Sequence, residues 1–163
     1  MSSARGFTLI EILIGMTILM VGLLAIAAMF PFAFVAVNES GKMTMTLTGQ
    51  RQILEDIRSV PFTQLVNLNG FDTTNTGTLP AGAPEREIAR RWRYALAGEG
   101  NGFTYTADEK SRWSTLSTAG GTFGGRGRIT VTSPSATLRL VTITISIPPK
   151  WKDVQIATLI SRM

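Results

Sequence analysis

A long uncharged and apolar run near the N-terminus constrains this 163-residue chain more than any other feature. Residues 12–37 contain no charged side chain. In a helix that rises 1.5 Å per residue they would extend about 39 Å. The hydrocarbon core of a bilayer needs only about 20 apolar residues in helical form. The run is therefore long enough to cross a membrane as one helix.

Two simple interpretations of this run leave one residue unexplained. A cleaved secretory signal has an apolar region of about 7–15 residues behind a basic start, whereas this run is longer and only Arg5 precedes it. A plain membrane anchor fits better, and the positive-inside rule then keeps its N-terminus in the cytoplasm. Neither explains Glu11, a carboxylate at the start of the run, because an acid in lipid is costly unless it has a partner or reaches the headgroups.

The residue types that are missing exclude several classes of function. The chain has no cysteine, so a disulfide framework and a thiolate zinc site are both excluded. It has no histidine either, which excludes the hydrolases that use a Ser-His-Asp or Cys-His arrangement. The net charge of +5 is spread along the chain and favours anionic partners only weakly. We expect no enzyme, no cofactor and no metal site.

The residues around Glu11, GFTLIEILIGMTIL, resemble the N-terminal signature of type IV prepilins and type II secretion pseudopilins. In that family a short basic leader ends in glycine and is followed by Phe, Thr or Ser, Leu, Ile or Val, Glu, and an apolar helix. The resemblance implies that prepilin peptidase cuts between Gly6 and Phe7 and then methylates the new amino group of Phe7. It also implies that Glu11 pairs with the Phe7 amine of a neighbouring subunit, which supplies the partner that the acid needs.

The resemblance also implies where the protein works and with which partners. Before assembly it would cross the bacterial inner membrane once, in contact with lipid, with its N-terminus in the cytoplasm. It would then join other pilin subunits through the N-terminal helices, at an inner-membrane assembly platform, in a periplasmic or extracellular filament. The stretch GLLAIAAMFPFAF, the amphipathic segment after it and a strand–PPKW–strand pattern resemble PilV-type minor pilins. The lack of the cysteine pair that many major pilins carry favours a minor subunit. The alternative is a membrane-anchored binding module, for DNA or a surface, that does not polymerise.

We expect the chain to divide into four parts. The resemblance implies a leader at 1–6 and a transmembrane and filament-core helix at 7–37, and composition and periodicity indicate an amphipathic helix at 38–60 and a globular head at 61–163. Pro31 should kink or locally unwind the long helix, because it removes one backbone hydrogen bond. The apolar residues of the amphipathic helix follow helical spacing and predict its buried face: Met43, Leu47, Leu54 and Ile57.

The C-terminal part of the chain predicts an antiparallel sheet. From Val141 on, LRLVTITISI alternates between apolar and polar residues, with Val141, Ile143, Ile145 and Ile147 on one face. GRITVTS precedes it as a strand, and VQIATLIS follows as the returning strand after a PPKWKD turn. The apolar face of this sheet needs a cover, and the amphipathic helix can supply it. The fold class is therefore α+β, and the resemblance identifies it as the type IV pilin fold.

Weaker motifs raise two binding hypotheses. In ARRWRY the rings could stack on bases while arginines meet phosphates, which would make Arg90, Arg91, Trp92 and Arg93 a nucleic-acid contact. The competing interpretation is a solvated basic edge whose aromatic rings pack on the sheet. In NLNGFD the side chains of Asn67, Asn69 and Asp72 offer oxygen ligands of the kind that calcium prefers, but only one of them is an acid. The segment EREIARRWRYALAG, which contains ARRWRY, fits a helix or a strand equally well.

Overall fold

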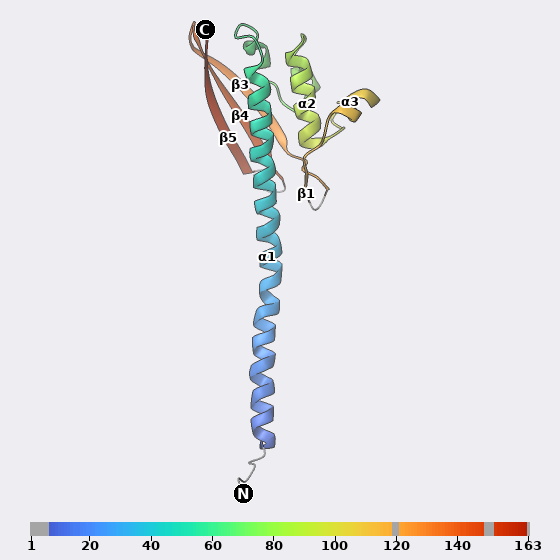
Figure 1. The fold of residues 1–163 in the computed structure, drawn as a ribbon, viewed down its shortest axis with the longest axis vertical. Coiled ribbons are helices and arrows are strands. Elements are labelled where there is room, and N and C mark those ends of the chain that lie inside the picture. Colours follow the sequence, from blue (N-terminus) through green and yellow to red (C-terminus); the bar gives the residue numbers. More distant parts are fainter. Residues whose placement is uncertain (1–6, 119–120, 149–151, 163) are drawn as a thin grey trace. The chain divides into compact units, whose positions relative to one another are not determined.

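The computed structural model describes residues 7–118, 121–148 and 152–162, and the chain divides into two compact units between Glu39 and Ser40. Helix α1 (Leu9–Arg58) supplies all of the described helix in the first unit and the first element of the second (Figure 1). The boundary falls where the apolar run ends and the first charge after Glu11 appears.

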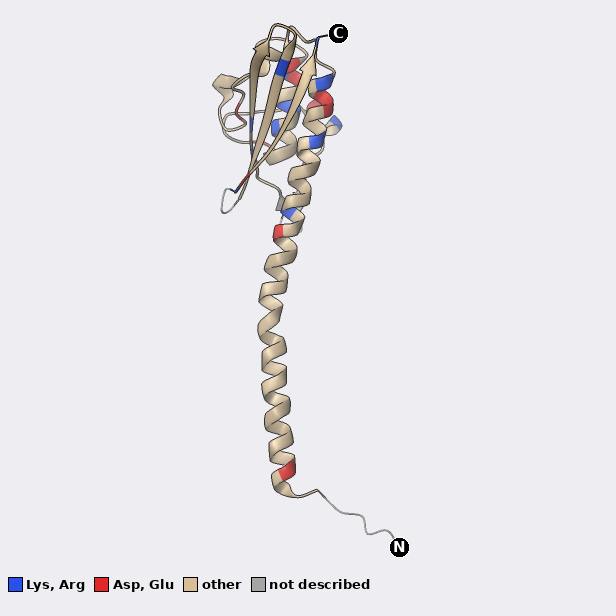
Figure 2. Cartoon of the chain, turned by 90° about the vertical axis from the view of Figure 1, so that its left-hand side faces the viewer, with Lys and Arg blue, Asp and Glu red and all other residues tan. Residues whose placement is uncertain are grey.

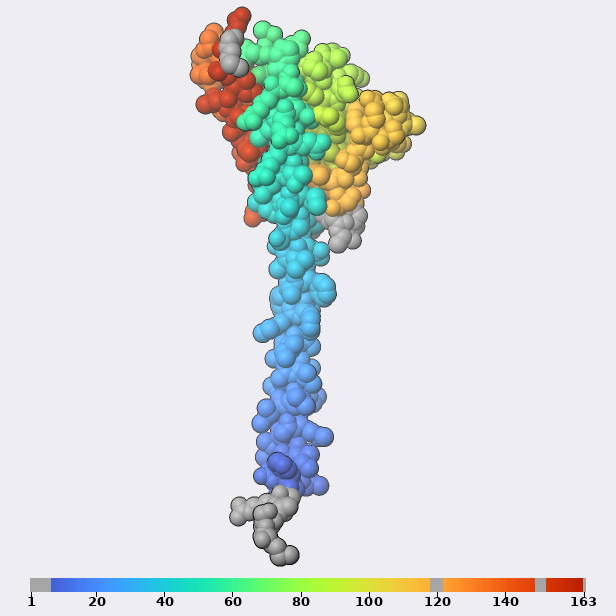
Figure 3. Space-filling model, in the orientation of Figure 1, coloured from blue at the N-terminus to red at the C-terminus, as the bar shows by residue number. Residues whose placement is uncertain are grey.

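The first unit is the apolar part of α1. All its described side chains are exposed, and Figure 3 shows them projecting from the helix. Figure 2 shows a single charged residue near the start of this segment, which is Glu11. Pro31 lies inside α1, and the helix continues on both sides of it, so local unwinding does not occur there. The kink at Pro31 stays a prediction, made from the one backbone hydrogen bond that proline cannot donate.

The second unit contains a three-stranded antiparallel sheet, which confirms the α+β prediction. Its strands are β3 (Arg126–Ser135), β4 (Leu138–Ile147) and β5 (Lys152–Ser161), in the order β3-β4-β5. The register aligns Ile129 with Ile143 and Ile143 with Ile156, so apolar side chains from all three strands share one face. The alternation in β4 is the predicted one: Val141, Ile143 and Ile145 are fully buried. Pro149, Lys150 and Trp151 of the expected turn lie outside the described residues.

The C-terminal part of α1 covers the apolar face of this sheet, with a face that matches the predicted one at Leu54 and Ile57, which are both buried, but not at the two earlier positions. Ile53 and Ile57 are fully buried, whereas Met43 and Leu47 are about two-fifths exposed, at 41% and 43%. One turn before Ile53 the helix buries Gln50, and two turns before Ile53 it buries Thr46. The prediction from Met43 and Leu47 was therefore wrong, since it counted apolar residues and ignored small and polar ones.

Close packing around Gly49 explains why α1 buries this face and not the one that carries Met43 and Leu47. A Cβ atom at Gly49 would lie 3.1 Å from a Leu116 methyl carbon and 3.3 Å from one of Leu96, so a side chain there would crowd both. The neighbouring Gln50 is buried because its amide donates a hydrogen bond of 2.9 Å to the Val154 carbonyl of β5. A buried polar group is tolerated when it is hydrogen-bonded in this way.

The segment EREIARRWRYALAG, which the sequence left undecided between helix and strand, forms helix α2 (Glu85–Ala97). Trp92 of α2 is 1% exposed, and its indole N–H donates to the Gly49 carbonyl at 3.2 Å. Its ring packs directly over Gly127 of β3, where any Cβ atom would collide with it. Through this one side chain α2 contacts both α1 and the sheet, and Figure 1 shows α2 beside α1.

The remaining elements are short and lie in the connections of the second unit. They are η1 (Leu65–Leu68), η2 (Thr76–Thr78), α3 (Ala107–Arg112), and the two-stranded sheet of β1 (Ser117–Thr118) and β2 (Gly121–Thr122). The chain after η1 runs along the outer edge of β3, where Gly70 N–H donates to the Ile129 carbonyl at 3.0 Å. Some of the backbone groups at that edge of the sheet therefore have hydrogen-bond partners within the chain.

Candidate processing and assembly segment

The start of α1 is held by three reciprocal hydrogen bonds between Thr8 and Glu11. The Thr8 backbone N–H donates to Glu11 Oε2 at 2.8 Å, and the Thr8 hydroxyl donates to the same oxygen at 2.9 Å. In return the Glu11 backbone N–H donates to Thr8 Oγ1 at 3.4 Å. Helix α1 begins at Leu9, so Thr8 stands at the N-cap position and the pair has the geometry of a capping box.

This capping box gives Glu11 a partner within its own chain. The carboxylate satisfies one backbone N–H that the first turn of a helix leaves free, and it lies at the positive end of the helix dipole. The sequence analysis missed this role, although the spacing Thr-x-x-Glu before an apolar run is a known signature of a helix start. Glu11 therefore stabilises the helix start irrespective of any second subunit.

The expected cleavage position lies immediately before this box. Gly6 is outside the described residues, so the structure places only the second residue of the expected site, Phe7. Phe7 is 83% exposed and precedes the helix. Its backbone is thus outside the helical hydrogen-bond ladder, which a peptidase would otherwise have to open. The predicted pairing of Glu11 with the Phe7 amine of another subunit concerns a second chain and stays a prediction.

The apolar segment of α1 has the properties of a membrane span. Among the described residues, one helix is long and apolar enough to cross a membrane by length and composition, and it is α1. None of the side chains in its most apolar window is buried within the chain. Large apolar side chains such as Phe30, Phe32 and Phe34 are more than half exposed. Apolar surface of this extent is costly in water, so it must be covered by lipid or by protein.

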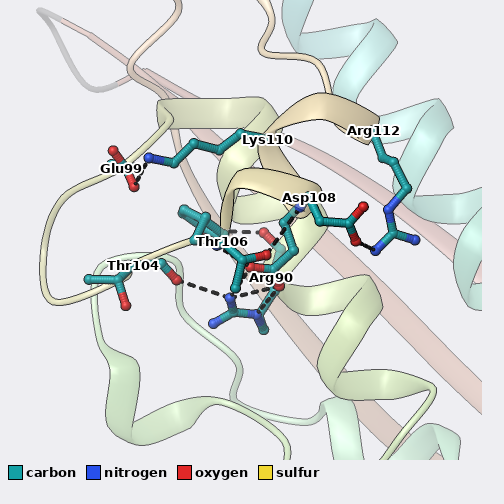
Figure 4. A network of polar contacts seen from close by, with 9 residues as sticks. Arg90, Glu99, Thr104, Thr106, Asp108, Lys110 and Arg112 are labelled. Carbon is teal, nitrogen blue, oxygen red and sulfur yellow. Dashed lines mark hydrogen bonds and ion pairs between the residues drawn. The ribbon is translucent and has the colours of Figure 1, made fainter.

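The structure does not present the ARRWRY segment as a binding surface. Trp92 and Arg93 are buried, at 1% and 2% exposure, so their side chains are not available to stack on bases or to meet phosphates. Arg91 forms an ion pair with Asp56 of α1. Arg90 is engaged by Glu109 (Figure 4). The arrangement is close to the competing interpretation, in which the aromatic ring packs on the sheet.

Arg90 and Glu109 join helices α2 and α3. The guanidinium of Arg90 donates to both carboxylate oxygens of Glu109 at 2.8 Å and to the Thr104 carbonyl at 2.9 Å. Glu109 also closes a capping box with Thr106 at the start of α3. Partial burial raises the pKa of the Glu109 carboxyl, but the Thr106 backbone N–H and the Arg90 guanidinium outweigh it and hold that pKa below its usual range.

The polar side chains of the NLNGFD loop make contacts within the chain. The Asn69 side-chain oxygen accepts from the Val131 N–H at 2.9 Å, and the Asp72 carboxylate accepts from Arg128 at 2.9 Å and from Thr74. The Asn67 amide donates to Glu85 at 3.0 Å. Within residues 7–118, 121–148 and 152–162, no three acidic side chains are grouped closely enough to hold a metal ion. These contacts tie the loop to β3 and α2.

Comparison with known families supports the N-terminal motif. Residues 1–27 match the model of the prokaryotic N-terminal methylation motif. Comparison with curated proteins and with solved structures found no significant match. The motif points to a structural pilin rather than to an enzyme, and the apolar helix near the N-terminus fits membrane anchoring before assembly. The matched motif, together with the α+β layout of a long N-terminal helix and an antiparallel sheet, supports a type IV pilin or pseudopilin precursor.

Proposed function

We propose that the chain is a structural minor pilin or pseudopilin, of the PilV type, that is cut between Gly6 and Phe7 and methylated on Phe7. Prepilin peptidase is its processing enzyme, and the mature chain joins other pilin subunits through α1 at an inner-membrane assembly platform. The observation that carries this proposal is the methylation motif over residues 1–27, placed on a helix whose apolar side chains have no cover in the single chain.

The apolar helix explains why the protein would polymerise. In the precursor, the apolar part of α1 is covered by lipid. In a filament, the same surface is covered by the α1 helices of neighbouring subunits, so transfer from membrane to filament keeps it out of water. The acid at its start must then be satisfied in an apolar bundle, since an unpaired buried charge is strongly destabilising.

Glu11 can meet that requirement in two ways, and cleavage adds the second. In the uncut chain, Thr8 supplies two hydrogen bonds to the carboxylate. Cutting before Phe7 creates a cationic amine, and an amine of a neighbouring subunit pairs with the carboxylate more strongly than neutral donors do. A subunit that stacks with its acid against this amine is thereby fixed in register along the filament.

The processing step is tested by mass spectrometry of the protein isolated from its native membrane. We expect an N-terminal peptide that begins at Phe7 with one added methyl group. A Gly6→Val variant should remain full-length and accumulate in the membrane, because a side chain at Gly6 obstructs the close approach of the peptidase. An unmethylated N-terminus, or one at another residue, would refute the processing claim.

The assembly step is tested separately with the Glu11 side chain. Glu11→Gln keeps the shape of the side chain but removes its charge, and we expect it to be processed normally and to be lost from sheared filaments. The chain contains no cysteine, so a single Leu24→Cys substitution on α1 reports contacts between subunits by oxidative crosslinking. Wild-type levels of Glu11→Gln in filaments would show that the ion pair is not needed. A chain that never crosslinks to a pilin would favour the membrane-anchored binding module instead.

A further inference from the structure

The two outer strands of the three-stranded sheet differ in how their free edges are covered. β3 forms one edge of the sheet and β5 the other (Figure 1). At β3 the segment after η1 takes up the outward backbone groups: Gly127 N–H donates to Thr73 Oγ1 at 2.8 Å. Ile129 N–H donates to the Phe71 carbonyl at 3.0 Å. No backbone–backbone hydrogen bond reaches the outer side of β5 from the part of the chain that the structure describes. The sheet is therefore closed at β3 and open at β5.

The pairing pattern shows which backbone groups of β5 face the open edge. Ile129 of β3 bonds outward, so the residues on either side of it bond to β4. By the same alternation, the odd-numbered residues of β4 bond to β5, and the even-numbered residues of β5 stand opposite them. The N–H and C=O groups of Gln155, Ala157 and Leu159 consequently point away from β4. They form a row to which a further strand can bond.

The apolar face of the sheet is also incompletely covered at β5. Ile129 of β3 and Ile143 of β4 are fully buried, but Ile156, in the same cross-strand row, is only half-buried. The neighbouring row, which ends at Thr158, repeats this pattern, and Ile160 packs against the core while it stays half-buried. Both β3 and β5 are outer strands, so an outer position does not by itself explain the difference. A strand added at β5 covers these side chains.

The sequence of β5 does not protect its open edge. Edge strands of natural proteins carry charges, proline or a bulge that prevent pairing with another chain. Residues 154–161, VQIATLIS, contain no charged residue, no proline and no glycine, and their register with β4 is uninterrupted. Charged residues stand only at the ends, at Lys152, Asp153 and Arg162. We call residues 154–161 the β5 edge. At about 3.3 Å per residue it extends about 26 Å, which is longer than an average strand.

We propose that the β5 edge binds an extended strand from the head of a neighbouring pilin subunit of another kind. The inference rests on the proposed function, in which α1 brings other pilin subunits beside this chain. The added strand bonds through its backbone to Gln155, Ala157 and Leu159, and it places apolar side chains against Ile156 and Ile160. The partner strand that fits is uncharged over about eight residues and apolar at alternate positions.

Charge argues against a second copy of this chain as the occupant. An antiparallel contact between two β5 strands that keeps their core-facing sides together places Lys152 opposite Arg162. A shift by two residues places Lys152 opposite Ile160 or Arg162 opposite Val154. A parallel contact in register places each end charge beside its own copy. Like charges directly opposite each other destabilise a sheet, and a different partner strand avoids them.

Amide hydrogen exchange tests the strand addition on the full-length protein in detergent micelles and in sheared native filaments. In micelles the amides of Gln155, Ala157 and Leu159 should exchange fast, whereas that of Ile156, which bonds to β4, should exchange slowly. In filaments the first three amides should exchange at least about tenfold more slowly than in micelles. Unchanged exchange in filaments that contain the chain would overturn the strand addition alone. A chain that is absent from filaments would instead refute the proposed function.

A substitution at the edge tests whether the strand addition matters for assembly. Ala157→Pro removes one outward N–H and leaves the hydrogen bonds to β4 in place. Its level in filaments should be at least about tenfold below that of Ala157→Ser, which keeps the N–H. Equal levels of the two variants in filaments would overturn the proposal. Thermal melts of both purified proteins show whether the head is folded.

A second variant decides if Ala157→Pro does not fold. Thr158→Lys places a charge on the core-facing side of the edge strand, which blocks the addition of another strand. We expect it to be depleted from filaments relative to Thr130→Lys, the same change at an exposed position of β3. Equal levels of these two variants would contradict the proposal as well.

Oxidation of an Ala157→Cys variant tests the other occupant. The chain has no cysteine, and the antiparallel contact of two β5 strands brings the two copies of residue 157 opposite each other. We expect no disulfide-linked homodimer from this variant. A homodimer that forms through this position would assign the β5 edge to a second copy and overturn the proposal.

Discussion

Gly127→Ala is the substitution that tests the packing of the head most directly. A Cβ atom at Gly127 would lie 2.7 Å from Trp92 Cζ3 and 2.7 Å from Leu96 Cδ1, and closer still to Trp92 Cη2. Carbon atoms in contact normally stand about 3.5–4.0 Å apart, so the indole ring would have to retreat by about 1 Å. The ring cannot do so freely, because its N–H is bonded to the Gly49 carbonyl and the side chain is buried.

The expected cost follows from these contacts. Overpacking a core by one methyl group costs about 1–3 kcal/mol, and loss of the indole hydrogen bond adds about 1 kcal/mol. The sum is about 2–4 kcal/mol in the free energy of unfolding. For a domain of this size 1 kcal/mol shifts the melting temperature by roughly 3–5 °C, so we expect Gly127→Ala to melt about 10 °C lower than the wild type.

The assay is a thermal melt of the full chain in detergent micelles, followed by tryptophan fluorescence and by circular dichroism of the sheet. Gly41→Ala is the matched control: it lies within α1 in the same unit, and nothing stands within 4 Å of its added Cβ atom. There alanine should be neutral or stabilise by up to about 1 kcal/mol, since it is the better helix former. A Gly127→Ala protein that melts with the wild type would refute the close packing of Trp92 on β3.

The two remaining predictions concern hydrogen-bonded carboxylates. Thr8→Ala removes the hydroxyl that donates to the Glu11 carboxylate and accepts from the Glu11 backbone N–H. The substitution should destabilise the first turn of α1 by about 1 kcal/mol, seen as faster amide exchange near Leu9 with no change in the head. Thr17→Ala, within the same helix, is the control. Equal amide exchange rates near Leu9 in the two variants would contradict the capping role of Thr8. The lowered pKa of Glu109 means that its stabilising contribution is fully present above the unfolded glutamate pKa of about 4.3 and is lost as pH falls through the lower folded pKa. Melting temperatures between pH 6 and pH 3 should therefore fall less steeply for Glu109→Gln than for the wild type, and parallel curves would contradict this assignment.

The local pattern of the sequence was enough for the elements that depend on their own residues. The apolar run at 12–37 is longer than a membrane requires, so its helix and its exposure follow from composition alone. In β4 the strict alternation of Val141, Ile143 and Ile145 fixes which face is buried, because successive side chains of a strand point to opposite sides. The Thr8–Glu11 capping box was likewise present in the sequence as a spacing, although only the structure drew attention to it.

Tertiary structure decided what depends on a neighbouring surface. Helical spacing could not show that α1 buries Thr46 and Gln50 in place of Met43 and Leu47, because that choice depends on how closely Leu96 and Leu116 approach Gly49. The ARRWRY segment left open whether its aromatic rings contact nucleic acid or pack on the sheet, and the missing side chain of Gly127 leaves the room that Trp92 fills in the core. Burial is a property of two surfaces that meet, and a single stretch of sequence describes only one of them.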